Sequence, residues 1–547
     1  MRQFLMATAA AVALTGPVEA GIALSVLGQY QSGIYQESAA EIVTYDAASR
    51  RAFVINAASG EVDVLDLSDP ANPVRAFGID VSDLGADANS VATRNGIVAV
   101  AVEANVRTDP GFVALYDTDG NRLAVVEVGA LPDALTFSTD GRWVLVANEG
   151  EPNDDYGIDP EGSVSILDLA AGAANVTQAD VRTADFRAFD GREDELRAQG
   201  IRIFGPGATA SQDFEPEWVE VAADNRTAYV SLQENNASAV VDIETASVTA
   251  IHPLGFKDWS AEGAWSGAGF DASDRDDAIE LRHWPVRGIF QPDTIRLYET
   301  DGEVFVVTAN EGDSRDYGGY SEEYRIGAGE VTLAADVFPD AATLQAPENL
   351  GRLRFTTSLG YRDDPDCVAQ VTATGDPSAC VFEELYVFGA RSMAIFRVGD
   401  DGLELVFDTG SQMEETVAAA YPEHFNANHA RNGTFDDRSD DKGPEPEGIA
   451  VGAVDGRTYA FVGLERIGGV MVYDITEPAA TRFVQYVNNR DFSLPNEPDA
   501  LTTTDLGAEG LHFVPAADSP DADGRPLLLV GNEVSGTTTV FAIDRVE

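Results

Sequence analysis

The chain has 547 residues, of which 44% are hydrophobic, so it is long enough to bury a large core. Acidic residues number 93 and basic residues 35, which gives a formal net charge of -58 at pH 7. A charge of this size repels nucleic acid and anionic membranes and favours cationic partners, although adaptation to salt or to solubility explains it equally well. We therefore expect divalent cations, and no nucleic acid, among the partners.

The first twenty residues are typical of an export signal. Arg2 precedes an apolar run from Phe4 to Leu14. Val18-Glu19-Ala20 then supplies a small-residue cleavage site. The apolar run is too short to span a bilayer, and no later segment approaches that length. We expect residues 1–20 to be removed and the mature protein to be exported, periplasmic or extracellular, without a transmembrane segment.

Short strand signals dominate the rest of the chain. Runs of Val, Ile, Leu, Phe and Tyr alternate with Asp-Gly or Gly turns. Counting second strands indicates eight repeating units, whereas counting first strands indicates seven, because the unit at 384–398 has no clear opening. The spacing favours radial repetition, since an open β-solenoid would need shorter and more uniform periods. We predict an all-β fold, a single β-propeller domain over residues 21–547 with seven or eight blades.

Long polar and Gly-rich insertions interrupt the repeat. They lie near residues 176–214, 256–290, 312–350 and 411–444. Several leave from the acidic end of a strand, so we expect the inserted loops on one face of the propeller. The stretch 190–199 indicates a short helix. An isolated strand at 22–30 is expected to become the outer strand of the last blade and to close the ring.

Cys367 and Cys380 are the only cysteines of the chain. In an oxidising compartment, we expect a disulfide that closes the short Gly- and Pro-containing loop between them. No histidine lies near them in the sequence, so they make a poor zinc site. We therefore predict a disulfide that holds a loop.

A two-part acidic motif recurs along the chain. An acidic residue, usually after proline, opens the first strand of a unit, and Asn-Glu or a similar pair closes the second. The openings are Leu131-Pro132-Asp133, Glu215-Pro216-Glu217, Gln291-Pro292-Asp293 and Glu445-Pro446-Glu447, with weaker versions at Ala508-Glu509 and Ala40-Glu41. The closings are Asn148-Glu149, Gln233-Glu234, Asn310-Glu311, Leu464-Glu465, Asn532-Glu533 and Val102-Glu103. Because antiparallel neighbours run in opposite directions, both corners lie at one edge of a sheet, and radial repetition predicts a ring of carboxylates.

Carboxylates in this ring and in the insertions are the oxygen ligands that hard divalent cations require. Without a cation, several converging carboxylates would raise one another's pKa and destabilise the fold. No loop has the EF-hand spacing, so the prediction rests on composition. We predict calcium as the cofactor, with these ligands: Asp133, Glu149, Asp154, Asp155, Glu217, Asp274, Asp293, Glu311, Asp313, Asp437, Asp440, Glu447 and Glu509.

Basic residues are scarce, so those within the acidic loops are informative. Arg315, Arg438 and Lys442 each lie among aspartates or glutamates. A basic side chain beside metal-bound carboxylates is the arrangement that a phosphate ester requires, with the metal on one oxygen and the side chain on the others. The alternative is an ion pair that relieves local repulsion. These three residues are therefore candidate phosphate-binding residues.

Other catalytic signals are weak. His424 and His429 could be metal ligands or a general base, or could have only a surface or capping role. The sequence contains no Gly-x-Ser-x-Gly elbow, no P-loop and no dinucleotide fingerprint. We therefore disfavour a serine hydrolase and a nucleotide-dependent enzyme.

Several longer motifs resemble the choice-of-anchor I family. They are Leu131-Pro132-Asp133-Ala134-Leu135-Thr136-Phe137, Val146-Ala147-Asn148-Glu149-Gly150-Glu151-Pro152, Gly162-Ser163-Val164-Ser165-Ile166, Asp271-Ala272-Ser273-Asp274, Thr308-Ala309-Asn310-Glu311-Gly312-Asp313-Ser314-Arg315 and Arg438-Ser439-Asp440-Asp441-Lys442-Gly443-Pro444-Glu445-Pro446-Glu447-Gly448. The resemblance covers nearly all of residues 22–545. It implies an exported β-propeller at a surface or outside the cell, because the family includes the mesenchyme-specific cell-surface glycoproteins associated with biomineral.

The same resemblance bears on activity and attachment. Bacterial members of the family are often labelled alkaline phosphatase. Members commonly carry a C-terminal anchor, whereas this sequence ends on a strand-like segment, 541–545, which favours a periplasmic or released protein.

Two functions are consistent with these observations. The first is a calcium-binding propeller that acts as a surface, matrix or ligand-binding module, with a mineral surface as one partner. The alternative is a calcium-dependent alkaline phosphatase or phosphoesterase, in which the ions polarise the phosphoryl group and Arg315 or Arg438 holds it. A third idea is a face that docks a protein, with the acidity serving solubility alone.

Overall fold

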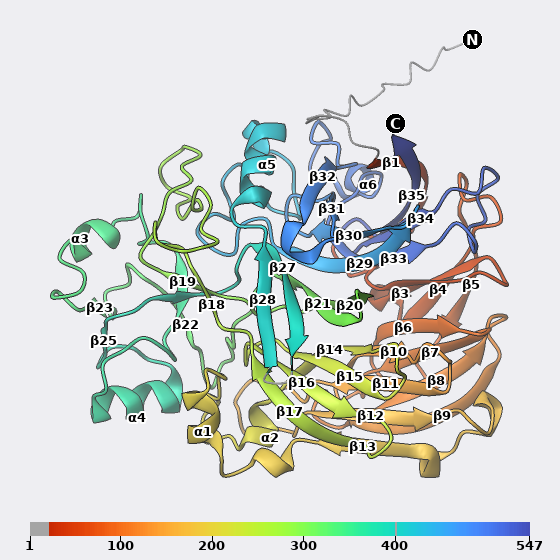
Figure 1. Ribbon diagram of the computed structural model, residues 1–547, viewed down its shortest axis with the longest axis horizontal. Helices are drawn as coiled ribbons and strands as arrows, with labels where there is room; N and C mark the ends of the chain where they lie inside the picture. Colours follow the sequence, from red (N-terminus) through yellow and green to blue (C-terminus); the bar gives the residue numbers. More distant parts are fainter. Residues whose placement is uncertain (1–20, 400–401, 547) are drawn as a thin grey trace.

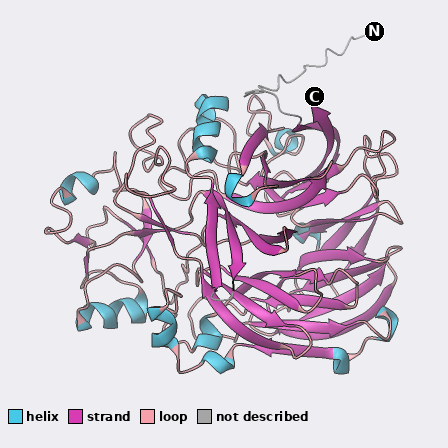
Figure 2. Ribbon diagram, viewed as in Figure 1, coloured by secondary structure: helices cyan, strands magenta, loops and turns pink. Residues whose placement is uncertain are grey.

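The computed structural model describes residues 21–399 and 402–546, so the predicted export signal at 1–20 lies outside the described residues. The molecule consists mainly of strands, with short helices at its periphery (Figure 1 and Figure 2). Among the described residues, seven sheets have four antiparallel strands each. The predicted all-β propeller fold is confirmed.

The second strands of these sheets are continuous apolar runs, such as β7 (Ile97–Val102) and β11 (Trp143–Asn148), because both of their faces are covered by neighbouring sheets. The seven sheets, each from its first strand to its last, are β2 (Val43–Asp46), β3 (Arg51–Asn56), β4 (Glu61–Asp66), β5 (Val74–Asp80); β6 (Ala88–Arg94), β7, β8 (Pro110–Asp117), β9 (Arg122–Ala130); β10 (Pro132–Phe137), β11, β12 (Ser163–Asp168), β13 (Val181–Asp185); β14 (Pro216–Val221), β15 (Thr227–Leu232), β16 (Ala237–Asp242), β17 (Ser247–Pro253); β20 (Ile295–Thr300), β21 (Glu303–Asn310), β27 (Ser392–Gly399), β28 (Gly402–Asp408); β29 (Pro446–Val454), β30 (Arg457–Leu464), β31 (Val470–Asp474), β32 (Arg482–Val487); and β33 (Ala508–Val514), β34 (Leu527–Asn532), β35 (Thr537–Val546), β1 (Gly21–Gln31).

The first strands contact one another in a closed cycle. The order is β2, β6, β10, β14, β20, β29 and β33, and β33 returns to β2. The region near residue 388, which a count of second strands treats as a unit, is divided between two sheets. There β26 (Tyr386–Val387) joins β18 (Phe256–Asp258) and β19 (Arg287–Ile289), while β27 is the third strand of the sheet that β20 begins.

The first strand of the described chain closes this cycle. β1 pairs antiparallel with β35, from Gly21 opposite Val546 to Gln31 opposite Thr537. Its sheet therefore takes three strands from the C-terminal end of the chain and one from the N-terminal end. The predicted closing strand at 22–30 is confirmed.

The long insertions leave from one face. They connect β13 to β14, β17 to β20, β21 to β27, and β28 to β29. In an antiparallel sheet, the first strand starts at the edge where the second and fourth strands end, so all of these connections begin and end at the same edge. The predicted placement of the inserted loops is confirmed.

Two insertions form a side lobe with its own core, which lies beside the sheets at the left of Figure 1. The connection from β21 to β27 covers 311–391, longer than the predicted 312–350, because the chain returns through the lobe before it re-enters the propeller. The lobe core includes Trp259, Phe270, Phe355 and Phe382. Besides β18, β19 and β26, the lobe contains β22 (Glu323–Arg325), β23 (Thr332–Leu333), β24 (Arg354–Thr356), β25 (Val381–Phe382), α3 (Ala341–Leu344) and α4 (Pro365–Thr374).

Cys367 and Cys380 form the predicted disulfide within this lobe. Cys367 lies in α4 and not in a loop, because Pro365 occupies the first helical turn and the Asp364 carboxylate accepts hydrogen bonds from two backbone amides of that turn. The bridge joins α4 to the residue before β25, and both cysteines lie in the lobe core.

The remaining helices are short. α1 (Glu193–Ala198) confirms the helix predicted near 190–199, and the others are α2 (Ala210–Asp213), α5 (Gln412–Ala420) and α6 (Pro498–Leu501). Across residues 21–399 and 402–546, no helix has the length and apolar content required to cross a membrane.

Ring closure by β1 makes a prediction about two positions on that strand. Leu24 is 7% exposed and Val26 is 45% exposed, although both pair with β35. We expect Leu24→Thr to lower the free energy of unfolding by about 3 kcal/mol, because it leaves a void and buries a hydroxyl. Val26→Thr should change it by less than about 0.5 kcal/mol. Urea unfolding followed by circular dichroism measures both, and equal effects would contradict closure by packing of this strand.

Candidate functional site

The repeated acidic motif forms the same corner in successive sheets. The residue before its opening acid pairs across the first two strands with the residue before the closing glutamate, or before Gln233 in β15, so that Gln233 and not Glu234 takes the closing position there. The pairs are Pro132 with Asn148, Pro216 with Leu232, Pro446 with Leu464, and Ala508 with Asn532. In each pair the ladder shifts register immediately after the opening residue, which is the mark of a β-bulge. A bulge redirects the side chain that follows it, so the opening acid departs from the normal alternation of the strand.

The residue before proline holds this corner in place. Leu131, Gln291 and Glu445 have φ values of 47°, 44° and 50°, in the left-handed region that costs a non-glycine residue about 1–2 kcal/mol. The carbonyl of Leu131 accepts a hydrogen bond of 2.8 Å from the amide of Glu149, and the carbonyl of Glu445 accepts one of 2.9 Å from Glu465. Each of these hydrogen bonds therefore joins the residue in the left-handed conformation to the backbone of the closing acid.

A cavity of about 520 Å³ lies where these corners converge. Eleven carboxylate side chains line it, against three basic ones. The acids are Glu41, Asp87, Glu103, Asp133, Glu149, Glu217, Asp293, Glu311, Asp313, Glu447 and Glu509, and the bases are Arg107, Lys442 and Arg466. We call this the axial cavity, because each of the seven first strands carries or follows one of its acids. The structure thus brings the predicted ring together.

Eight of the thirteen predicted ligands line the axial cavity. They are Asp133, Glu149, Glu217, Asp293, Glu311, Asp313, Glu447 and Glu509. The other five, Asp154, Asp155, Asp274, Asp437 and Asp440, do not line it. The corner motif therefore predicted the cavity residues more accurately than the density of acidic residues in the inserted loops did.

The five outlying aspartates have local partners. Asp154 accepts a hydrogen bond of 2.9 Å from the amide of Gly318, and Asp155 accepts one of 3.0 Å from Gly157. The remaining three lie next to arginines. Asp274 pairs with Arg352 at 3.0 Å, Asp437 with Arg431 at 3.3 Å, and Asp440 with Arg352 at 3.0 Å. These carboxylates hold loops or neutralise arginines.

Four groups of side chains in the described residues bring three possible ligand atoms within 4.8 Å of one another. They are Asp133, Glu149 and Glu217; Glu311, Glu445 and Glu465; His429, Glu465 and Glu533; and Asp271, Asp276 and Asp436. The groups differ in whether the protein supplies its own positive charge. A group to which the protein supplies no positive charge is the one that requires an external cation.

Basic side chains neutralise two of these groups. Glu445 pairs with Arg438 at 2.7 Å and with Arg466 at 2.8 Å, and Glu311 pairs with Lys442 at 2.6 Å. The three basic groups hold the pKa of Glu445 well below its usual range despite its burial. This group is therefore a network of internal ion pairs.

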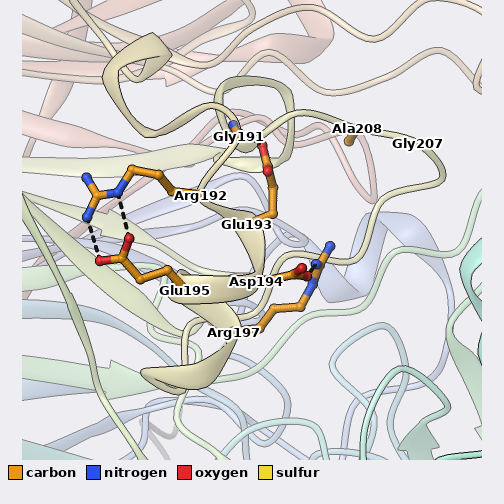
Figure 3. A pocket seen from close by; sticks show the side chains of 8 residues that line it. All are labelled: Gly191, Arg192, Glu193, Asp194, Glu195, Arg197, Gly207 and Ala208. Atoms are coloured by element: carbon orange, nitrogen blue, oxygen red, sulfur yellow. Dashed lines mark hydrogen bonds and ion pairs between the residues drawn. The ribbon is translucent and has the colours of Figure 1, made fainter.

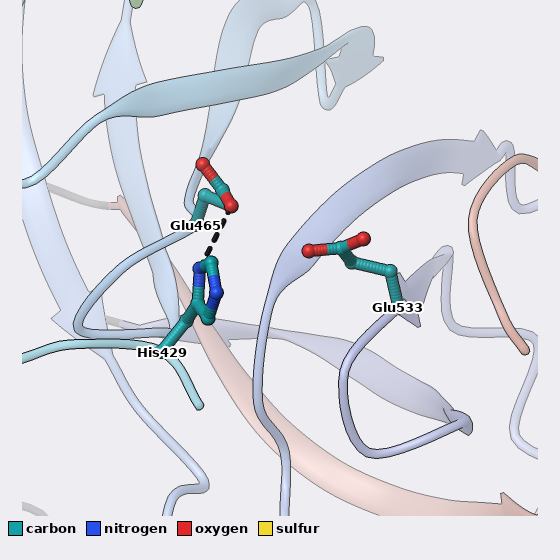
Figure 4. A group of neighbouring side chains, drawn as sticks. All are labelled: His429, Glu465 and Glu533. Atoms are coloured by element: carbon teal, nitrogen blue, oxygen red, sulfur yellow. Dashed lines mark ion pairs between the residues drawn. The ribbon is translucent and has the colours of Figure 1, made fainter. Parts of the chain in front are cut away.

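The histidine group lies beside the same network. Figure 4 shows His429 directed toward Glu465, with the Glu533 carboxylate facing them from a neighbouring sheet. Nδ1 of His429 lies 2.9 Å from Glu465, and Arg466 lies 2.7 Å from the same carboxylate. Since Arg466 already supplies a positive charge, this group has less need of a metal ion.

The group at Asp133, Glu149 and Glu217 forms no such ion pair, and Arg107 only partly offsets the rise in the pKa of Asp133. No ion pair joins these three carboxylates to a basic side chain in residues 21–399 and 402–546, and the nearby Arg107 pairs with Glu151 at 2.6 Å. Burial raises the pKa of Asp133 to about 7, with a further contribution from Glu151. Burial also raises the pKa of Glu149 and of Glu217 well above the usual range, and neighbouring carboxylates add to both shifts. At neutral pH these oxygens must hold protons or share a cation.

Five other acids of the axial cavity also have raised pKa values. Burial raises the pKa of Glu41 to about 8 and that of Glu311 to about 7. It also raises the pKa values of Asp293, Glu447 and Glu509 well above their usual range. Oε2 of Glu447 is buried without a hydrogen-bond partner among the described residues. The cavity thus concentrates negative charge that the surrounding protein only partly offsets.

The three predicted phosphate-binding residues differ in accessibility. Arg315 is 2% exposed, and its guanidinium contacts Asp213 at 2.7 Å and Glu215 at 2.8 Å. Arg438 is held by Glu445 and by Asp441. Lys442 lines the axial cavity. The two arginines therefore form the internal ion pairs that were the alternative to phosphate binding.

The sequence prediction omitted several cavity residues. Glu41 and Glu103 belong to weaker versions of the motif, whereas Asp87 lies one residue before Ala88, at the position that Leu131 occupies before Pro132. Alignment by strand register in place of the proline would have placed Glu103 at the closing position, since Ala88 pairs with Val102 as Pro132 does with Asn148, but it puts Asn89 and not Asp87 at the position of Asp133. Arg107 and Arg466 carry no signal in the motif.

A second hollow, of about 340 Å³, lies over α1. Figure 3 shows Arg192 paired with Glu195, and Arg197 also pairs with Asp194. These pairs join residues three apart on an exposed helix, which is ordinary surface stabilisation. We assign no function to this hollow.

The family model for the choice-of-anchor I domain matches residues 41–478. The chain belongs to this family. The chain is 32% identical over 170 residues to gigasin-3a of Magallana gigas, a match covering 29% of this chain and 58% of that protein. It is 30% identical over 295 residues to the mesenchyme-specific cell surface glycoprotein of Strongylocentrotus purpuratus, covering 50% of this chain and 36% of the relative. The chain therefore matches less than two thirds of either relative's length.

Two solved structures are similar over most of the chain. Hydrazine synthase of Kuenenia stuttgartiensis has 12% identity and a TM-score of 0.45, with 94% of this chain and 99% of that chain covered. The periplasmic gluconolactonase PpgL of Pseudomonas aeruginosa has 12% identity and a TM-score of 0.37, with 82% and 85% covered.

The raised pKa values predict how stability depends on pH when metal is removed. Carboxyls ionise near pH 4 in the unfolded chain, whereas Asp133 and Glu41 ionise at about pH 7 and 8 in the fold. The folded state thus binds more protons across this window, so its stability must fall as pH rises from about 4 to 8.

We expect the melting temperature in chelator to decrease over this window, and calcium to remove much of the decrease. Asp133→Asn should make the decrease shallower, because it removes one of the groups responsible. Asp155→Asn, an exposed control outside the axial cavity, should leave the slope unchanged. Equal slopes in both variants and the parent would show that general surface charge, and not the axial carboxylates, sets the pH dependence.

Proposed function

We propose that this protein is an exported surface β-propeller whose axial cavity binds a divalent cation, calcium, and that it acts as a binding or matrix module. The proposal rests on one observation. Asp133, Glu149 and Glu217 from adjoining sheets converge without a basic partner among the described residues. An external cation supplies the charge that the protein does not.

The separation of the three carboxylates accommodates an ion of calcium size. Ligand oxygens on opposite sides of calcium lie about 4.8 Å apart, since each bond is about 2.4 Å long, and the three carboxylates fall within that separation. Gln233 and Asn89 also line the cavity, and their amide oxygens are suitable additional ligands. Magnesium demands shorter bonds and near-octahedral order, which a wide ring of carboxylates suits less well.

One relative supports placement at a surface. The sea urchin relative is named as a mesenchyme-specific cell surface glycoprotein, and the matched region covers half of this chain. The acidic axial mouth would suit a cationic partner or the calcium sites of a mineral surface.

Calcium titration of chelator-treated protein tests the proposal. Isothermal calorimetry should show binding, and calcium at millimolar concentration should raise the melting temperature. The double variant Asp133→Asn/Glu217→Gln should bind calcium at least about tenfold more weakly at the axial site, because two of three charged ligands are lost. Asp155→Asn should bind like the parent. Absence of both heat and thermal shift in the parent would reject the proposal.

A calcium-dependent phosphoesterase is the second candidate. Lys442, Arg107 and Arg466 line the same cavity as the proposed ligands, so a phosphate ester could meet a metal ion and a basic side chain together. Lys442 would then have the role that the sequence suggested for Arg315 and Arg438. The bases are few and already paired, which makes this the weaker alternative.

A chromogenic phosphate ester discriminates the two candidates. If the cavity is catalytic, turnover should require calcium and should fall at least about tenfold in Lys442→Met, because the substrate loses its positively charged contact. Arg226→Met, which removes an exposed arginine from an outer ion pair, is the matched control. Absence of turnover between neutral and alkaline pH, with calcium bound, would leave the binding module alone.

A further inference from the structure

Two insertions bring three aspartates together outside the axial cavity. Asp271 and Asp276 lie between β18 and β19, and Asp436 lies between β28 and β29. One oxygen of each lies within 4.8 Å of the others. None of the three lines the axial cavity, so the group is distinct from the site proposed above.

The burial of this group leaves oxygens without partners. Asp271 and Asp436 are 1% and 2% exposed. Oδ2 of Asp436 and Oδ2 of Asp276 are buried and accept no hydrogen bond from any described residue. A buried carboxylate oxygen without a donor or a counter-charge is strongly unfavourable. Each of these two carboxylate oxygens therefore requires a positively charged partner.

The protein does not provide that partner from its own side chains. Arg391 reaches the same loops, but it pairs with Glu414 at 2.6 Å and donates to the backbone carbonyls of Asp271 and Ser439. The flanking acids behave differently, since Asp274, Asp437 and Asp440 all pair with arginines. Within 21–399 and 402–546, no ion pair neutralises Asp271, Asp276 or Asp436.

The electrostatics agree with the geometry. Burial raises the pKa of Asp436 to about 8 and that of Asp271 to about 7. The two insertions meet here at α5, where the amide of Asp271 donates a hydrogen bond of 3.0 Å to Glu414. Repulsion among the three aspartates would push the insertions apart at this point of contact.

We propose that Asp271, Asp276 and Asp436 bind a second divalent cation, of calcium size, which ties the 256–290 insertion to the 411–444 insertion. Buried Asn426 is a candidate fourth ligand, because its Oδ1 has no partner among the described residues and its amide donates to Ser439, which in turn donates to Asp436. The donor set consists of oxygens alone, which suits calcium and not zinc or copper. The ion stabilises the join between the side lobe and the segment that carries α5.

The number of calcium ions retained per chain in equilibrium dialysis tests this site. In a background of Asp133→Asn and Glu217→Gln, which removes axial ligands, we expect one ion to remain, and addition of Asp436→Asn to abolish it. Asp437→Asn, at the next residue, removes a carboxylate that pairs with Arg431 and should leave the ion bound. A background that retains no ion would overturn the inference. If only the axial site fails to bind calcium, the axial-site background still retains one ion per chain, so the two proposals are tested separately.

Hydrogen exchange provides a second readout. At calcium of about one hundred times the dissociation constant, any opening that releases the ion is suppressed about one hundredfold. In the axial-site background, amides in both 270–280 and 426–439 should then exchange about one hundredfold more slowly, and Asp276→Asn should abolish that protection. Asp276→Asn serves as the second variant because Asp436→Asn also alters the hydrogen bond from Ser439. Protection confined to one insertion, or protection that survives both variants, would overturn the inference.

Discussion

Antiparallel pairing places the start of each first strand beside the end of each second strand, and this constraint generates the whole axial site. The bulge after Pro132, and its equivalents in other sheets, then turn the opening acid out of the strand alternation. Because β1 closes the ring, the same local corner recurs around it, and the acids of these corners form a continuous lining of the axial cavity. The resulting repulsion cannot be relieved by moving a single loop, because the carboxylates are held by different sheets.

The protein resolves this repulsion unevenly. Lys442, Arg438 and Arg466 gather around Glu445, where they form a dense internal network. The opposite part of the ring, at Asp133, receives no direct ion pair among the described residues. With 35 basic residues against 93 acidic ones, the chain cannot neutralise every buried cluster. Protons and cations from solution are the remaining sources of positive charge, and we propose that cations bind at the two uncompensated clusters.

The sequence predicted features that depend on local pairing and missed those that depend on contacts between distant insertions. Asp133 and Glu149 could be identified because one hairpin defines their corner. The sequence could not show that Arg352, far along the chain, pairs with Asp274, because this contact joins two insertions. The side lobe was predicted as polar loop, because its apolar residues are scattered over two insertions and form a core only when these come together.

Anomalous diffraction from crystals grown with manganese, which substitutes for calcium at oxygen sites, would locate the axial ion directly. We expect a peak within bonding distance of Asp133, Glu149 and Glu217 at neutral pH. A well-ordered axial cavity that shows no peak there, with the same carboxylates linked to one another by shared protons or to ordered water, would contradict cation binding by the axial carboxylates.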